Sequence, residues 1–144
     1  MGANVMSKHI RKRFGHEPND NQPIPTVSAI KAAVARDVGL PLRRMTDHSR
    51  KWKFSRPRQI AMYLACEMTW HSYPAIARIF GGYDHTTILH AHRIVRARME
   101  ADQELEMRVN RLEREILEQV AYRTPVAPVT ILSILQITQL EAAA

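Results

Sequence analysis

Apolar residues recur at helical spacing in four stretches of the chain, and turn-forming residues separate the stretches. The first stretch predicts a helix that Thr26 or Ser28 caps and that runs to about Val38. Gly39 and Pro41 then stop it. Its apolar face consists of Val27, Ile30, Val34 and Val38.

The second stretch follows a short helical turn at Leu42–Thr46 and a basic loop from Asp47 to Ser55. Ser55 is the expected N-cap, with Pro57 tolerated in the first turn, and the helix runs to about Met68. Because this helix is rich in apolar residues, we expect it to be the buried central helix.

The third stretch, Ser72 to about Arg98, is interrupted by the glycine pair Gly81-Gly82. A short helix precedes the pair, and Asp84 can cap a second helix whose first turn is polar. Helix, glycine turn and second helix form a helix-turn-helix pattern, so the sequence predicts an all-α fold.

The fourth stretch, residues 101–123, is charged and strongly helical, with a heptad-like apolar stripe at Leu105, Val109, Leu112 and Ile116. This helix either forms a homodimer or packs back onto its own domain. The apolar tail 129–144 is ambiguous between strand and helix, and it can complete an interface or bind a protein partner. The predicted organisation is a disordered basic arm (1–25), a helix-turn-helix domain (26–98) and a C-terminal extension (99–144).

Charge is unevenly distributed along the chain. Residues 1–60 carry 13 Lys/Arg and 4 Asp/Glu, whereas residues 99–144 carry 4 and 8. The N-terminal part is therefore the expected polyanion-binding side, and the alternative is a basic surface that only keeps the protein soluble.

Several kinds of site are not expected. A single cysteine, Cys66, fits a reducing cytoplasm, and no Cys/His set has zinc-ligand spacing. The apolar run from Val129 to Leu140 is too short to span a bilayer, and the N-terminus lacks the apolar core of a signal peptide. Without a Gly-x-x-x-x-Gly-Lys-Ser/Thr loop we expect no ATP binding, and we expect no cofactor.

The polar first turn after Gly82 is the strongest candidate for base recognition. Asp84 can accept from a cytosine amino group, His85 can donate or accept, and Thr86 and Thr87 offer hydroxyl and methyl groups. The structural alternative is an ordinary capped helix start.

Two segments carry a family resemblance: Gly-Gly-x-Asp-His-Thr-Thr-Ile-Leu-His-Ala at 81–91, and Arg-Pro-Arg-Gln-Ile-Ala-Met-Tyr-Leu at 56–64. Together they resemble the C-terminal DNA-binding domain of the bacterial replication initiator DnaA, over about Thr26 to Val95. The resemblance implies a helix-turn-helix bundle of the Trp-repressor-like type. It also implies base readout by Arg50, in the minor groove, and by Asp84, His85, Thr86 and Thr87. The contacts that it implies to the DNA backbone or flank are Lys51, Lys53, Arg56, Gln59, Ser72, Tyr73, Pro74 and His90; His90 could equally lie on the helix flank.

The chain departs from the family pattern at three positions. Tyr83 replaces an arginine, which removes a positive charge beside the recognition helix. Cys66 replaces a lysine, which removes a possible phosphate contact. Trp52 replaces a residue in a run that is more basic in many members. Trp52 and Phe54 lie within the basic loop, where they either stack on unpaired bases or, as we expect, pack the loop onto the domain.

These features predict sequence-specific binding of double-stranded DNA by a nucleoid-associated cytoplasmic protein that regulates transcription or replication initiation at DnaA-box-like sites. The alternative is a protein-interaction module that modulates a replication initiator through its C-terminal tail. We do not expect an enzyme, because no nucleophile–base pair or carboxylate pair occurs in a convincing context.

Overall fold

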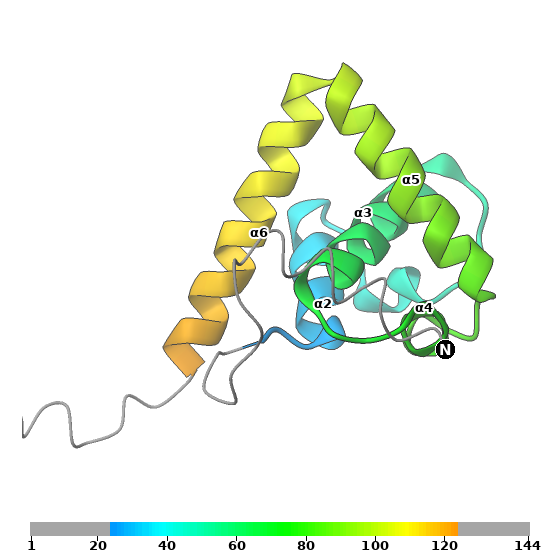
Figure 1. Cartoon of the computed structure of the whole chain (residues 1–144), viewed down its shortest axis with the longest axis horizontal. Helices are drawn as coiled ribbons and strands as arrows, with labels where there is room; N and C mark the ends of the chain where they lie inside the picture. Colours follow the sequence, from blue (N-terminus) through cyan, green and yellow to red (C-terminus); the bar gives the residue numbers. More distant parts are fainter. Residues whose placement is uncertain (1–23, 124–144) are drawn as a thin grey trace, which may run out of the picture.

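The computed structural model describes residues 24–123, so the predictions for most of the basic arm and for the tail 124–144 lie outside the described residues. Over this range the fold is all-α, as the sequence predicted, with five α-helices, one 3-10 helix and no strand. The helices are α2 (Val27–Asp37), η1 (Leu42–Met45), α3 (Trp52–Met68), α4 (Tyr73–Ile79), α5 (His85–Ala101) and α6 (Gln103–Arg123). Helices α5 and α6 meet at a sharp bend and diverge as two arms, with α2 and α3 between them (Figure 1).

Helix α3 is the central helix, because it contacts α2, η1, α4, α5 and α6. Its middle is buried almost without interruption from Ile60 to Cys66. Side chains from every other helix surround it, including Ile30, Phe80 and Val95, all fully buried. Burying a side chain of this size contributes roughly 1.5–3 kcal/mol, so this core holds the helix-turn-helix in place.

Three of the predicted helix starts are confirmed, and one is wrong. Thr26, Ser72 and Asp84 each accept a hydrogen bond from the first turn of α2, α4 and α5. Helix α3, however, begins at Trp52 rather than after Ser55. The backbone N–H of Ser55 already donates to the carbonyl of Lys51 at 2.9 Å, which places Ser55 inside the helix.

The apolar stripe of α6 faces the core of its own domain. Leu105, Val109, Leu112 and Ile116 are all buried together with residues of α2 to α5. The structure therefore supports the second of the two alternatives for this helix, packing onto its own domain. The predicted boundary at residue 98 falls within α5, which continues to Ala101.

An ion-pair cluster fastens α6 to α2. The Arg108 Nε and the Arg111 guanidinium each lie 2.7 Å from a different carboxylate oxygen of Asp37, at the last residue of α2. The arginines also place positive charge at the C-terminal end of α2, where the helix dipole favours it.

A buried lysine connects α2 to the end of α4, the first helix of the helix-turn-helix. Lys31 on α2 donates from Nζ to the carbonyl of Ile79 at 3.0 Å, at the last residue of α4. Burial lowers the pKa of Lys31. The contact satisfies a carbonyl that the end of a helix leaves without an intrahelical partner.

Candidate nucleic-acid interface

The turn between α4 and α5 depends on its glycines. Gly81 and Gly82 have φ angles of 104° and 79°, in a region that residues with a Cβ rarely adopt. A Cβ at Gly81 would also come within 2.5 Å of the carbonyl oxygen of Thr46. The helix-turn-helix turn is therefore pressed directly against the segment that precedes the basic loop.

The first turn of α5 is exposed, and Asp84 organises it. Asp84 Oδ1 accepts from the backbone N–H of Thr86 at 2.8 Å and from its hydroxyl at 2.5 Å, and His85 Nδ1 lies 3.4 Å away. These hydrogen bonds, the one from the Thr86 hydroxyl first, lower the pKa of Asp84. Asp84 is therefore an ionised N-cap, as both interpretations of this turn predicted, while His85 and Thr86 stay accessible to a ligand.

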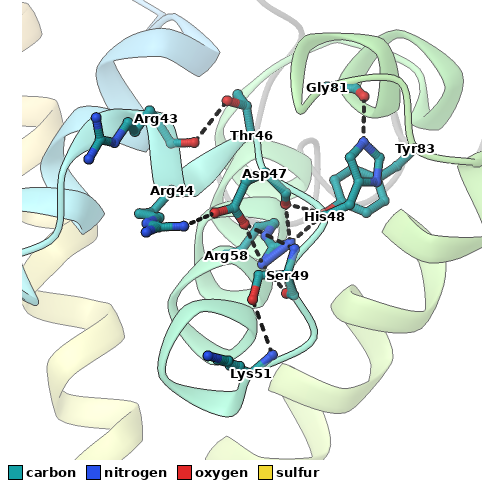
Figure 2. A network of polar contacts seen from close by, with 10 residues as sticks. All are labelled: Arg43, Arg44, Thr46, Asp47, His48, Ser49, Lys51, Arg58, Gly81 and Tyr83. Carbon is teal, nitrogen blue, oxygen red and sulfur yellow. Dashed lines mark hydrogen bonds and ion pairs between the residues drawn. The ribbon is translucent and has the colours of Figure 1, made fainter.

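The basic loop is held by a buried arginine. Arg58 on α3, whose side chain is only 5% exposed, donates to the carbonyl of Ser49 at 2.7 Å and also to the carbonyl of Asp47 and the hydroxyl of Tyr83. Figure 2 shows this guanidinium at the centre of the loop. The loop backbone is thus fixed from inside, immediately before Arg50.

Asp47 closes the same network from the loop side. Its carboxylate accepts from Arg44 at 2.9 Å and from the backbone N–H of Ser49 at 3.1 Å (Figure 2). The hydrogen bond from Arg44 is the main reason why the pKa of Asp47 is lowered.

Tyr83 and His48 join the loop to the helix-turn-helix turn. The Tyr83 hydroxyl donates to the carbonyl of Asp47 at 2.6 Å, and its ring lies 4.3 Å from that of His48. The His48 Nε2 in turn lies 3.0 Å from the carbonyl oxygen of Gly81 (Figure 2). Tyr83, which the sequence marked only as a lost positive charge, is a structural link between the two elements.

A hollow of about 440 Å³ lies between the loop, α3 and α5. Four of the predicted site residues line it together: Arg50, Gln59, Thr87 and His90. A minor-groove candidate and two recognition-helix residues thus share one concave surface.

Lys53 and Arg56 lie elsewhere. Both line a second hollow of about 350 Å³, on another side of α3, together with Trp52. Lys51 follows Arg50 of the first hollow and precedes Trp52 of the second in the sequence, and it is exposed.

The predicted packing of the loop aromatics is wrong for Trp52, whereas Phe54 is half-buried and contacts Arg44 of η1. The cationic groups of Arg44 and Lys53 lie 4.6 and 4.9 Å from the centroid of the Phe54 ring. Trp52 is 70% exposed, because the first residue of α3 points away from the core.

The remaining predicted contacts lie at the start of α4. Ser72 and Pro74 are exposed, and Tyr73 is half-buried, with its pKa raised by burial. Cys66 is 4% exposed, and burial strongly raises the pKa of its thiol. The side chain of Cys66 therefore faces the core.

Residues 27–95 match the family described as the bacterial DnaA protein helix-turn-helix. Residues 27–95 are a DnaA-type helix-turn-helix domain. The match covers α2 to most of α5, and α6 lies beyond it.

Individual relatives agree with this DnaA assignment. The chain is 37% identical over 115 residues to the chromosomal replication initiator protein DnaA of Sphingopyxis alaskensis, which covers 80% of this chain and 25% of that protein. A crystal structure of a DNA replication initiation factor superposes with a TM-score of 0.60 at 29% identity, covering 65% of this chain and 29% of that one. The chain thus spans about a quarter of the length of the curated relative.

The sequence alone did not single out Arg58, which holds the basic loop of this DnaA-type domain, or His48, which contacts the turn. A signal for Arg58 existed, because it precedes Ala61 and Met62 by three and four residues and so lies on the buried face of α3. Between residues 24 and 123 no group of three or more His, Cys, Asp or Glu side chains could hold a metal ion. None of the described helices is long and apolar enough to cross a membrane.

Proposed function

We propose that the chain binds double-stranded DNA sequence-specifically at sites related to the DnaA box and thereby regulates transcription or replication initiation. The observation that carries this proposal is the first hollow, where Arg50 and residues of α5 face one concave surface. In this proposal the first turn of α5 enters the major groove, and Arg50 enters the adjacent minor groove.

The arrangement of Arg50 supports insertion into a groove. The network around Arg58 fixes the backbone at Asp47 and Ser49, while the Arg50 side chain itself is exposed. A preorganised loop loses little conformational entropy on binding, and a guanidinium is attracted by the enhanced negative potential of a narrow A·T-rich minor groove.

The capped first turn of α5 supports base readout. Asp84 is ionised, and a carboxylate at a DNA-facing tip repels phosphates but can accept from a cytosine amino group. His85, Thr86 and Thr87 follow it on the same turn and offer hydrogen bonds and thymine-methyl contacts.

Phosphate contacts supply affinity rather than specificity. Lys51, Lys53 and Arg56 are exposed on the loop and on the first turns of α3. Gln59, Ser72, Tyr73 and Pro74 are the proposed backbone contacts from the α3 and α4 side. Each cation that neutralises a phosphate makes binding more sensitive to salt, so the observed affinity should fall steeply as salt is raised.

The test is a fluorescence-anisotropy titration at about 150 mM salt, because affinity must be compared at a fixed ionic strength. A duplex that carries a DnaA box is compared with a scrambled duplex of the same composition. We expect preference for the box, and Arg50→Ala and Thr86→Ala should each cost roughly 1–3 kcal/mol of specific binding.

Arg114→Ala is the matched control, because Arg114 is an exposed cation on α6. It removes the same charge as Arg50→Ala but should leave the preference for the box unchanged. Unchanged specific affinity in both Arg50→Ala and Thr86→Ala would refute the proposed docking mode.

A further inference from the structure

The second hollow contains apolar surface to which the proposed duplex contacts give no role, and of its lining residues only Lys53 and Arg56 are among those contacts. Its lining combines an exposed indole, an apolar floor from Val38, Ile60 and Leu105, and cations on its rim. Trp52 is the largest strongly exposed apolar side chain between residues 24 and 123. We propose that this hollow binds an unpaired base of DNA, stacked on Trp52, with the neighbouring phosphate on Lys53 and Arg56.

The position of Trp52 suits a stacking platform. It is the first residue of α3, so no helical turn precedes it to cover the ring. The guanidinium of Arg56, one turn further on, lies 5.5 Å from the indole centroid. This cation–π contact orients the ring and keeps a positive charge beside it.

The charges around the hollow select an anionic ligand. Lys53, Arg56, Arg98 and Arg108 line it, against the carboxylates Asp102 and Glu104. Asp102 is engaged in capping α6, since its Oδ1 accepts from the backbone N–H groups of Glu104 and Leu105 at 3.1 and 3.2 Å. Arg108 is paired with Asp37, so Lys53, Arg56 and Arg98 are the cations left for a phosphate.

The second hollow and the proposed duplex site lie on two sides of α3, near the same short segment of the chain. Arg50 and Lys51 directly precede Trp52, and α3 separates the two hollows, with Gln59 on one side and Arg56 on the other. A strand that unpairs at the edge of a bound duplex would therefore meet Trp52 next. The inference rests on the proposed function only in assuming that the unpaired strand comes from a duplex bound at the first hollow.

An apolar peptide is a poorer occupant of this surface. The apolar floor is rimmed by cations, and a peptide that covered it would bury their charges without a partner, which is costly. A nucleotide satisfies both parts, because every base has a face that can stack and every phosphate is negative.

The experiment compares three probes: a blunt box duplex, the same duplex with an oligo-dT overhang at either end, and oligo-dT alone. Binding is followed by anisotropy and by quenching of tryptophan fluorescence. We expect one of the overhangs to tighten binding. The gain in affinity should be roughly fivefold to 150-fold, which corresponds to the free energy of stacking one base on an aromatic ring. Trp52→Leu should remove this gain.

Two variants separate stacking from other effects. Trp52→Phe keeps an aromatic face and should retain most of the gain, whereas Trp52→Leu keeps only apolar area. Tyr122→Ala removes another strongly exposed aromatic ring, 92% exposed near the end of α6, and should change nothing.

The outcomes are distinct. If neither overhang tightens binding, or if Trp52→Leu weakens blunt and tailed duplexes equally, the inference is overturned. If oligo-dT binding depends on Trp52 while box and scrambled duplexes bind alike, the proposed function fails and the inference stands.

Discussion

Arg58→Met should detach the basic loop from the domain. The variant keeps an unbranched apolar stem in a buried site but removes the donors to the carbonyls of Asp47 and Ser49 and to the hydroxyl of Tyr83. The Asp47 carbonyl retains Tyr83 as a donor, whereas the Ser49 carbonyl loses the only donor that the structure gives it among the described residues. The consequence is a local loss of order just before Arg50.

The size of the effect follows from these contacts. An unsatisfied buried acceptor costs roughly 1–3 kcal/mol, and a hydrogen bond from a charged donor contributes roughly 1.5–3 kcal/mol. Removing the guanidinium also removes its desolvation cost, so the contributions do not simply add. We expect a loss of about 2–4 kcal/mol, which lowers the melting temperature of a domain of this size by at least about 8 °C.

The assay is thermal unfolding followed by circular dichroism, with Arg56→Met as the control. Arg56 lies on the same part of α3 but is exposed, so its replacement should change stability by no more than about 0.5 kcal/mol. Limited trypsin digestion should cut Arg58→Met faster after Arg50 and Lys51, because the loop opens more often. Equal melting temperatures for the two variants would refute the role assigned to Arg58.

Two further predictions concern the packing of α6 and the ionised carboxylate of Asp47. Leu112→Ala, at a fully buried position of α6, should lower the free energy of unfolding by roughly 2–5 kcal/mol. The melting temperature should not depend on protein concentration. A concentration dependence would instead indicate that α6 is an oligomer interface. Asp47 has its pKa lowered below the ordinary 3.8 in the folded state, so its contribution to stability is complete above that value and is lost as the pH falls through the folded pKa. Asp47→Asn should therefore flatten the acid limb of the stability curve, and parallel curves for the two proteins would contradict this.

The sequence predicted the helices well, because their signals are local. The caps at Thr26, Ser72 and Asp84 and the glycine turn specify helix starts and stops without reference to the rest of the chain. The start of α3 was misplaced because Ser55, two residues before Pro57, also has the sequence of a good local cap. In the structure, contacts of Arg58 and Phe54 with the preceding segment continue the helix back to Trp52.

The candidate site was predictable only in part, for a related reason. Arg56 and Arg58 look alike in sequence, yet one is exposed and the other is buried under the loop. Which arginine can meet a phosphate and which holds the backbone depends on the direction of each side chain from α3. The same holds for Tyr83, whose hydroxyl bonds to a residue 36 positions away.

The close approach of Gly81 to Thr46 has a consequence for how this domain can evolve. No side chain fits between the turn and the segment before the loop, and His48 and Tyr83 bridge the same seam. The two proposed DNA-reading elements cannot shift against each other by gradual side-chain enlargement at this contact. Under the proposed function, a change of target sequence would therefore come from exchanging the exposed side chains at the start of α5 and in the basic loop. The distance between these two elements would stay the same.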